Sequence, residues 1–329
     1  MITVEEWCGG DYPQSTRLPD FDTSVITHHQ ADVHLVALHQ QQMVGRLSLW
    51  WNQVPKLNSE RLGVVGHFDA VDASVASDLL LQARQRLKAR GCTVMVGPMD
   101  GNTWRRYRWV NDAGSEPLFF LEPGNPPAYV DYFLQAGFRP MARYISSLVA
   151  DLNTQDPRIP AACERLQKQG ISWRALDMSR FEDELKAIYQ LSIQSFSGNF
   201  LYTPITEAGF LQQYQSVQAV VEPQLVLLAE QQGELLGYLF AIPDLNQARR
   251  GEVVDTCVLK TVAVLPGRRA AGLGAVLVAE CHRIARDMGY RRVIHALMHA
   301  SNKSKNLSSH YGQSIREYTL YQYDLDDRP

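Results

Sequence analysis

The sequence predicts an α/β protein built from two similar domains in tandem. Three observations carry this prediction: the length, a similarity between the two halves, and a strand–loop–helix segment around residue 270. The chain has 329 residues, which is more than one hydrophobic core usually serves. Residues 153–160 are polar and contain two prolines, which is typical of a linker. We therefore expect domains at 1–152 and 153–329.

The most informative segment is 260–275. A β-branched run ends near Pro266, the spacing Arg269-x-x-Gly272-x-Gly274 follows, and an amphipathic helix begins directly afterwards. Such a turn presents backbone N–H groups, a helix N-terminus and cationic side chains to one point, which suits a pyrophosphate. Glycine lets a phosphate approach the backbone and permits a positive φ.

Other interpretations of this loop compete with a pyrophosphate site of that kind. A Rossmann fingerprint needs Gly-x-Gly-x-x-Gly, whereas the glycines here are spaced Gly267-x-x-x-x-Gly272-x-Gly274. A P-loop is excluded because no Gly-Lys-(Ser/Thr) follows. An ordinary strand-to-helix turn with two glycines is the purely structural alternative.

The order of strand, Pro266, Arg269-x-x-Gly272-Leu273-Gly274 and helix resembles the acyl-coenzyme A binding motif of the GCN5-related N-acetyltransferases (GNAT). The resemblance implies two tandem GNAT-like domains, each a mixed twisted sheet flanked by helices. It also implies acetyl-CoA or another acyl-CoA as cosubstrate, with a backbone N–H at 262–264 polarising the thioester carbonyl. The coenzyme-binding residues expected from it are Val262, Ala263, Val264, Arg268, Arg269, Ala270, Ala271, Gly272, Leu273, Gly274, Ala275 and Asn302. Asn302 would contact pantetheine, or it is a turn residue in a polar loop.

Residues 72–102 and 272–302 look like two copies of one unit. In each, a glycine (Gly91 or Gly289) closes an amphipathic helix, and a short strand ending in methionine precedes an asparagine. Paired strands at 33–51 and 225–243 extend the similarity upstream. Residues 132–138 also resemble the (Leu/Phe)-Tyr-x-x-x-Gly-Phe ending of GNAT domains, and a strand at 142–152 is expected to close the first copy.

The first copy departs from the motif at the coenzyme loop. When Gly91 is aligned with Gly289, residues 71–76 take the place of the loop, and the arginine and both glycines are missing. Asp69 and Asp72 stand where an anion would bind. A carboxylate at a helix N-terminus caps the helix but repels a pyrophosphate. The sequence therefore predicts that the first domain has lost coenzyme binding and that Asp72 is a structural cap.

Composition excludes several functional classes. The net charge is −3, so nucleic acid is an improbable partner. No apolar run reaches a membrane span. The N-terminus lacks signal-peptide features, which predicts a cytoplasmic protein. The five scattered cysteines indicate neither a disulfide framework nor a zinc site, and no metal is expected. Oligomerisation is left open.

Acyl transfer to an amine needs a base, because only the neutral amine attacks the thioester. Glu252 and Asp255 open the long strand before the loop, and His295 lies on the neighbouring strand. A carboxylate at a strand start is also a common solvated residue, and a lone histidine in a strand is also a common core residue. Cys257 as a covalent nucleophile is disfavoured, since direct attack needs none.

The acid that would protonate the leaving thiolate is Tyr311. The resemblance implies a tyrosine about seven residues after the asparagine and four before a glycine, but Ser308 and Ser309 occupy that window. Tyr311 directly precedes Gly312 and would take the place of that tyrosine from a shifted position. The alternative is that Tyr311 is a core aromatic. The predicted catalytic residues are thus Tyr311, Glu252 and His295.

Residues 102–109 interleave tryptophan, tyrosine and arginine. Such a patch can hold nucleic acid, or it can pack over a seam between domains, and the charge balance favours the seam. The predicted function is an acyl-CoA-dependent N-acyltransferase for a small-molecule or peptide amine. The alternatives are a non-catalytic acyl-CoA-binding or regulatory protein and a tandem-domain transferase that uses aminoacyl-tRNA.

Overall fold

The structure is a computed structural model that describes residues 1–154, 156–215, 217–267, 270–300 and 311–326. The elements of the first half are β1 (Thr3–Glu6), α1 (Ser24–His28), β2 (Val33–His39), β3 (Gln42–Trp50), β4 (Leu62–Ala70), α2 (Ala73–Ala89), β5 (Val94–Gly97), β6 (Trp109–Asp112), α3 (Ala128–Gln135) and β7 (Arg139–Val149).

The second half repeats this plan and adds further helices. Its elements are α4 (Ile159–Lys168), β8 (Ile171–Ala175), α5 (Phe181–Ser195), α6 (Glu207–Gln215), β9 (Val226–Gln231), β10 (Glu234–Pro243), α7 (Leu245–Arg249), β11 (Thr256–Val264), α8 (Leu273–Asp287), β12 (Arg292–His299) and β13 (Gln313–Asp324), with short 3₁₀ helices at Met178–Arg180 and Pro223–Leu225.

The strands form one continuous mixed sheet. Its order is β1-β2-β3-β4-β5-β13-β7-β12-β11-β10-β9-β8, and β6 pairs with β13 outside this path. β4 and β5 are parallel, as are β11 and β12, while the other pairs are antiparallel. The predicted α/β class with a mixed sheet flanked by helices is confirmed.

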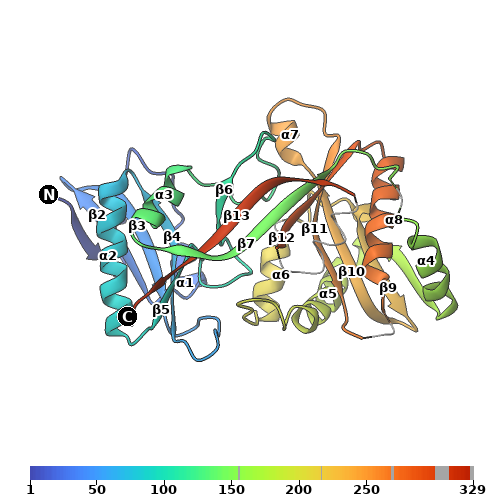
Figure 1. Cartoon of the computed structure of the whole chain (residues 1–329), viewed down its shortest axis with the longest axis horizontal. Coiled ribbons are helices and arrows are strands. Elements are labelled where there is room, and N and C mark those ends of the chain that lie inside the picture. The colour runs from blue at the N-terminus through green and yellow to red at the C-terminus, as the bar shows by residue number, and fades with distance from the viewer. Residues whose placement is uncertain (155, 216, 268–269, 301–310, 327–329) are drawn as a thin grey trace.

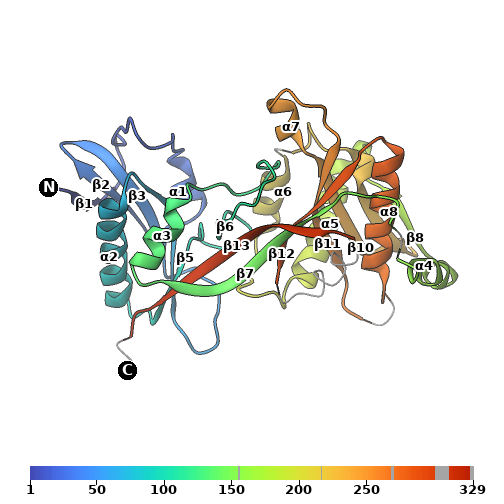
Figure 2. The same ribbon diagram turned by 45° about the horizontal axis from the view of Figure 1, so that its top comes forward.

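Two long strands, β7 and β13, connect the halves (Figures 1 and 2). β7 comes from the first half but pairs with β12. β13 comes from the C-terminus but pairs with β5 of the first half. The two strands also pair with each other over most of their length. Each half is therefore completed by a strand of the other, and a cut near residue 152 would break both pairings.

The predicted helices of the two copies form with the expected buried faces. α2 buries Val75, Ala76, Leu79, Leu80, Ala83 and Leu87. α8 buries Leu273, Val276, Leu277, Val278, Cys281, His282 and Ala285. Gly91 and Gly289 follow these helices with φ of +76° and +94°, so both take the left-handed conformation that ends a helix.

Helices cover both faces of the sheet in the second half. Successive side chains of β9 point to opposite faces of the sheet. Leu227 and Ala229 pack with α8, whereas Val226 and Leu228 pack with α5. α8 and α4 thus lie on one face, with α5 and α6 on the other. The ends of β11 and β12 run between these layers, and this is where the candidate site lies.

Candidate active site

The predicted coenzyme loop connects β11 to α8. Gly272 precedes the helix with φ +83°, a conformation that favours glycine. Among the described residues, no side chain caps this end of α8, and its first turn contains no acidic residue. The helix N-terminus therefore presents its positive partial charge to an anion.

The structure places the remaining predicted coenzyme residues around this turn. Val262, Ala263 and Val264 end β11, while Leu273, Gly274 and Ala275 begin α8. Ala270 and Ala271 lie between the two elements. Arg268, Arg269 and Asn302 fall outside the described residues.

β11 and β12 separate at the level of this loop. Their parallel pairing ends at Leu259 and His295. The register of β11 against β10 shifts beside Lys260, and β12 shifts against β7 between His295 and Met298. Such bulges bend a strand and redirect its side chains. A gap between the two strands is the result.

This gap opens into a cavity of about 760 Å³ between the two halves. One wall is formed by consecutive residues of β11, Leu259 to Val262, and another by His295 to His299 of β12. The first half contributes the segment 103–108 and residues 121–123. The cavity is thus lined from both halves, which is a common place for ligand sites.

The aromatic and arginine segment at 102–109 lies at this seam, as predicted. The Trp104 indole donates to the Thr203 carbonyl at 2.7 Å and packs against Phe196 and Phe210 of the second half. The Arg108 guanidinium stacks on Tyr107 and Tyr144 and donates to the Leu297 carbonyl at 3.5 Å.

An apolar pocket continues the cavity beneath α5. The two hollows share Tyr214, Val217 and Phe240 in their linings. The other residues that line the apolar pocket are Leu176, Phe181, Leu185, Ile188, Val221, Val226 and Tyr238. The pocket is narrow, with space for about 30 Å³, and presents no polar surface.

The corresponding gap in the first half is closed. β4 and β5 pair as far as Val64 and Val96 and then part. The Met99 amide donates to the Val65 carbonyl at 2.8 Å, and the His67 amide donates to the Asp100 carboxylate at 2.7 Å. A Cβ on Gly66 would collide with the Met99 carbonyl. Backbone therefore fills the space that is open between β11 and β12.

The two carboxylates of the degenerate loop serve the fold. Asp72 caps α2, since its side chain accepts from the Val75 amide at 3.0 Å, which confirms the predicted role. Asp69 forms a buried ion pair with Arg46 at 2.6 Å. The Tyr129 hydroxyl also donates to Asp69.

His295 lines the cavity and faces inward from β12. Its Nε2 lies 2.8 Å from Nε2 of His282 on α8, and burial lowers the pKa of His295 to about 3. The ring is therefore neutral at physiological pH and is a weak proton acceptor.

Tyr311 packs edge-on against the His282 ring at 4.9 Å. Among the described residues its buried hydroxyl has no hydrogen-bond partner, and Tyr311 is absent from the cavity lining. Burial raises the pKa of this hydroxyl above its ordinary value.

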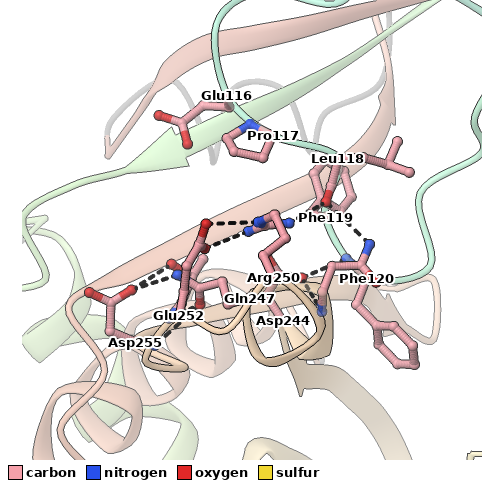
Figure 3. A network of polar contacts seen from close by, with 12 residues as sticks. Glu116, Pro117, Leu118, Phe119, Phe120, Asp244, Gln247, Arg250, Glu252 and Asp255 are labelled. Carbon is pink, nitrogen blue, oxygen red and sulfur yellow. Dashed lines mark hydrogen bonds and ion pairs between the residues drawn. The ribbon is translucent and has the colours of Figure 1, made fainter.

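The structure does not bring Glu252 to the cavity. Its exposed carboxylate pairs with the Arg250 guanidinium at 2.9 Å, and this contact holds the pKa of Glu252 below its usual value. Arg250 also donates to the Leu118 carbonyl, and the Asp244 carboxylate accepts from the Phe120 amide at 2.7 Å. Figure 3 shows this network, which holds the 116–120 segment of the first half against α7 and its following loop.

Sequence reasoning missed Lys260. It stands on β11 beside the bulge, lines the cavity, and donates from Nζ to the Leu121 carbonyl of the first half at 2.9 Å. A lysine inside an otherwise apolar, β-branched strand was the available signal.

No described helix has the length and apolarity needed to cross a membrane. In the described parts of the chain, no group of three or more histidine, cysteine or acidic residues could hold a metal ion.

Comparisons with known proteins agree with this geometry. Residues 185–308 match the model of the acetyltransferase (GNAT) family. A protein named bacterial ceramide synthase, from Caulobacter vibrioides (strain NA1000 / CB15N), is 30% identical over 214 residues, which is 62% of this chain and 54% of the relative. The chain thus spans about half the length of that curated relative.

Solved structures with the same fold include tandem proteins. A tandem GNAT protein from the clavulanic acid biosynthesis pathway aligns over 100% of both chains with a TM-score of 0.52 and 11% identity. A GCN5-related N-acetyltransferase from Sphaerobacter thermophilus aligns over 90% of this chain and 81% of its own, with a TM-score of 0.51 and 13% identity. The chain has the GNAT fold, and its second half carries a domain of the acetyltransferase (GNAT) family.

Proposed function

We propose that this protein transfers an acyl group from acyl-CoA to an amine by direct attack in a ternary complex. The observation that carries the proposal is that β11 and β12 stop pairing at Leu259 and His295, before β11 reaches the loop, and that the unpaired parts of both strands line the cavity between the halves. A coenzyme held at the loop would extend its thioester through the gap between these strands toward an acceptor in the cavity. Family membership supports the same chemistry.

We propose further that the acceptor is an amine with a hydrocarbon tail. The cavity of about 760 Å³ has room for such a tail, and it adjoins the narrow pocket beneath α5, which presents no polar surface. Burial of each CH₂ group in such a lining contributes roughly 0.8 kcal/mol. The relative named ceramide synthase supports this class, because a ceramide is an amide of a long-chain amino alcohol.

Release of free thiol tests the proposed reaction. Palmitoyl-CoA and acetyl-CoA would be offered with sphinganine, dodecylamine, butylamine and ethanolamine, and thiol would be measured with a chromogenic reagent. We expect amine-dependent release, faster with the two long-chain amines. Coenzyme binding without thiol release from any pair would favour a non-catalytic acyl-CoA-binding protein.

The apolar pocket can be tested separately. Val221→Phe would fill it from the wall and should slow turnover of dodecylamine several-fold while leaving butylamine unchanged. An equal effect on both amines would place the hydrocarbon tail elsewhere.

Tyr311 remains a proposal as the acid for the leaving thiolate. Tyr311→Phe removes a hydroxyl that has no partner among the described residues, so stability should hold. An acid acts in the transition state, and its loss should lower kcat about 10²–10⁴-fold with little change in KM. A change in kcat below about threefold would mean that Tyr311 is a core aromatic and not the acid.

A further inference from the structure

We propose that Lys260 is the general base that deprotonates the acceptor ammonium. The assignment rests on the proposed function and deepens it, because it names the group that accepts the proton. It stands on the position of Lys260 in the open gap, its contact with the first half, and the charges that face it.

The fold places the Lys260 amine at the junction of gap and cavity. The residue follows directly after Leu259, where the pairing of β11 with β12 ends. The shift of register between β10 and β11 leaves Lys260 without a paired residue on β10. Two residues further along, Val262 belongs to the strand end predicted to polarise the thioester carbonyl, and it also lines the cavity. Base and carbonyl donor would thus stand on the same strand.

The hydrogen bond to Leu121 orients the amine. Nζ donates one N–H to the Leu121 carbonyl at 2.9 Å, which leaves the lone pair of the neutral amine free to accept a proton. Leu121 is fixed in turn by the loop of the first half, in which the buried Glu122 pairs with Arg316 at 2.8 Å.

The surroundings favour the neutral amine. Burial, with the Arg108 guanidinium as a further cause, lowers the pKa of Lys260 to about 7, and Glu122 opposes that shift. The other titratable and charged side chains of the cavity lining are Arg105, Arg106, Tyr107, Tyr144, Tyr202, Tyr214, His295 and His299. Glu122 is the one carboxylate among the described lining residues, and its charge is shared with Arg316. This cationic lining also disfavours an acceptor ammonium relative to its neutral amine.

The proton balance of the step is simple. The acceptor ammonium gives one proton to Lys260 Nζ, and the neutral amine attacks the thioester carbon to form the C–N bond. As the C–S bond breaks, the second proton on nitrogen goes to the departing sulfur, directly or through the acid that Tyr311 would supply. The products are the amide, free thiol and the Lys260 ammonium, which releases its proton to water.

The full-length Lys260→Met variant removes the base. Lys260→Arg keeps the positive charge, but arginine has no neutral form at pH 7 that could accept a proton from the acceptor. With palmitoyl-CoA and dodecylamine, we expect either change to lower kcat at pH 7 at least a hundredfold, within the range for a general base. Wild-type kcat should fall below about pH 7, as Lys260 becomes protonated, and level off above it. In the variants kcat should instead keep rising toward the pKa of dodecylamine itself.

A second readout does not depend on turnover. Trace acetylation of the wild-type chain with acetic anhydride, followed by mass spectrometry over pH 5.5–10, measures the neutral fraction of each lysine. Lys260 should reach half of its maximal reactivity near pH 7. The exposed Lys186, whose pKa its contact with Glu182 raises, serves as the control and should react only at much higher pH.

The outcomes separate the two proposals. If wild-type protein releases no thiol with any amine of the panel, the proposed function fails, and the base assignment fails with it. If wild type turns over and Lys260→Met matches it in kcat and pH profile, only the Lys260 assignment is overturned. A stable acyl adduct on Lys260 after incubation with palmitoyl-CoA alone would also overturn it, because a base must not be consumed.

Discussion

The β4–β5 junction of the first half and the β11–β12 junction of the second half begin alike and end differently. Both are parallel pairs that stop before the strands do, and both lead to a helix whose end is closed by a left-handed glycine. In the first half the backbone at Met99 and Asp100 fills the space between the strands. In the second half a bulge on each side leaves the space open.

The difference at the helix N-termini matches the difference between the strands. Asp72 places a carboxylate at the N-terminus of α2, whereas Gly272 at the N-terminus of α8 has no capping side chain and lies beside the Arg165 guanidinium. In the first half a carboxylate at the helix N-terminus therefore accompanies a closed gap between the strands. The first half supplies strand β13 with a partner and the cavity with part of its wall.

The largest expected effect comes from separating the halves. Residues 153–329 expressed alone lack β7, so β12 loses its antiparallel neighbour and β13 loses both β7 and β5. We expect this fragment to be insoluble or unfolded, as measured by circular dichroism and gel filtration. A folded fragment that binds coenzyme and acylates the same amine at full rate would show that the halves are independent modules.

Gly272→Asp should convert the open helix N-terminus into one like that of α2. The aspartate would intrude on the pyrophosphate, and like charges brought together without water cost several kcal/mol. Calorimetry with CoA should show binding weakened a hundredfold or more, from a wild-type stoichiometry of one per chain.

The matched control for this variant is Gly289→Asp, at the other end of the same helix. Gly289 also has a positive φ, but a Cβ there would meet nothing within 4 Å, whereas a Cβ on Gly272 would lie 3.3 Å from the Arg165 guanidinium. The Gly289→Asp substitution therefore imposes similar backbone strain and adds the same negative charge, but it does so away from the coenzyme loop. Equal loss of coenzyme binding in both variants would show that backbone strain, and not the coenzyme loop, causes the effect.

Gly66→Ala should destabilise the closed gap. Its Cβ would meet the Met99 backbone, which cannot rotate away as a side chain can. We expect a loss of about 1–3 kcal/mol in the free energy of unfolding, measured by urea denaturation. The control is Thr261→Ile. Thr261 lies two residues after the last β11 residue that pairs with β12, and Gly66 lies two residues after the last β4 residue that pairs with β5.

Thr261 lines the open cavity, so a larger side chain there has room and should change stability by less than about 0.5 kcal/mol. A loss as large as that of Gly66→Ala would mean that the second gap is packed as tightly as the first.

Asp72→Ala should have the smallest effect. Loss of an N-cap typically costs about 1 kcal/mol, which a small fall in Tm would report. Coenzyme affinity and stoichiometry should not change, because α2 would gain an uncapped end but the neighbouring gap would remain closed. A second binding site appearing in this variant would contradict the view that closure of the strands excludes the ligand.

Much of the fold could be predicted because its signals are local. Hydrophobic periodicity located α2 and α8, and the glycines after them marked their ends correctly. The aspartate at the start of α2 was recognisable as a cap from its position alone. The patch at 102–109 was assigned to a seam from charge balance, and Trp104 does pack across it.

The candidate site could be predicted only where one short segment forms it. The loop before α8 is such a segment: Gly272 has the positive φ that its place in the motif permits, and its role in coenzyme binding stays a prediction. Glu252 has a carboxylate of the kind that a base needs, but it lies in the loop before β11, where Arg250 holds it in a network with α7. Lys260 stands out along the chain only as a lysine within an apolar, β-branched strand, and the sequence does not show that this side chain faces the cavity and the Leu121 carbonyl.

The sequence by itself determined the class of fold, the helices and terminating glycines shared by the two copies, and the Asp72 cap, because each depends on residues within about one helix or strand. The coenzyme loop and its loss in the first copy stay predictions. Tertiary structure alone decided the exchange of β7 and β13, the closed and open gaps, and the placing of Lys260 beside Leu121. The strand exchange and the Lys260 contact depend on residues more than a hundred positions apart, such as Val149 with Val293. The gaps depend on backbone contacts between neighbouring strands, such as Met99 with Val65, and on strand bulges that no local pattern specifies.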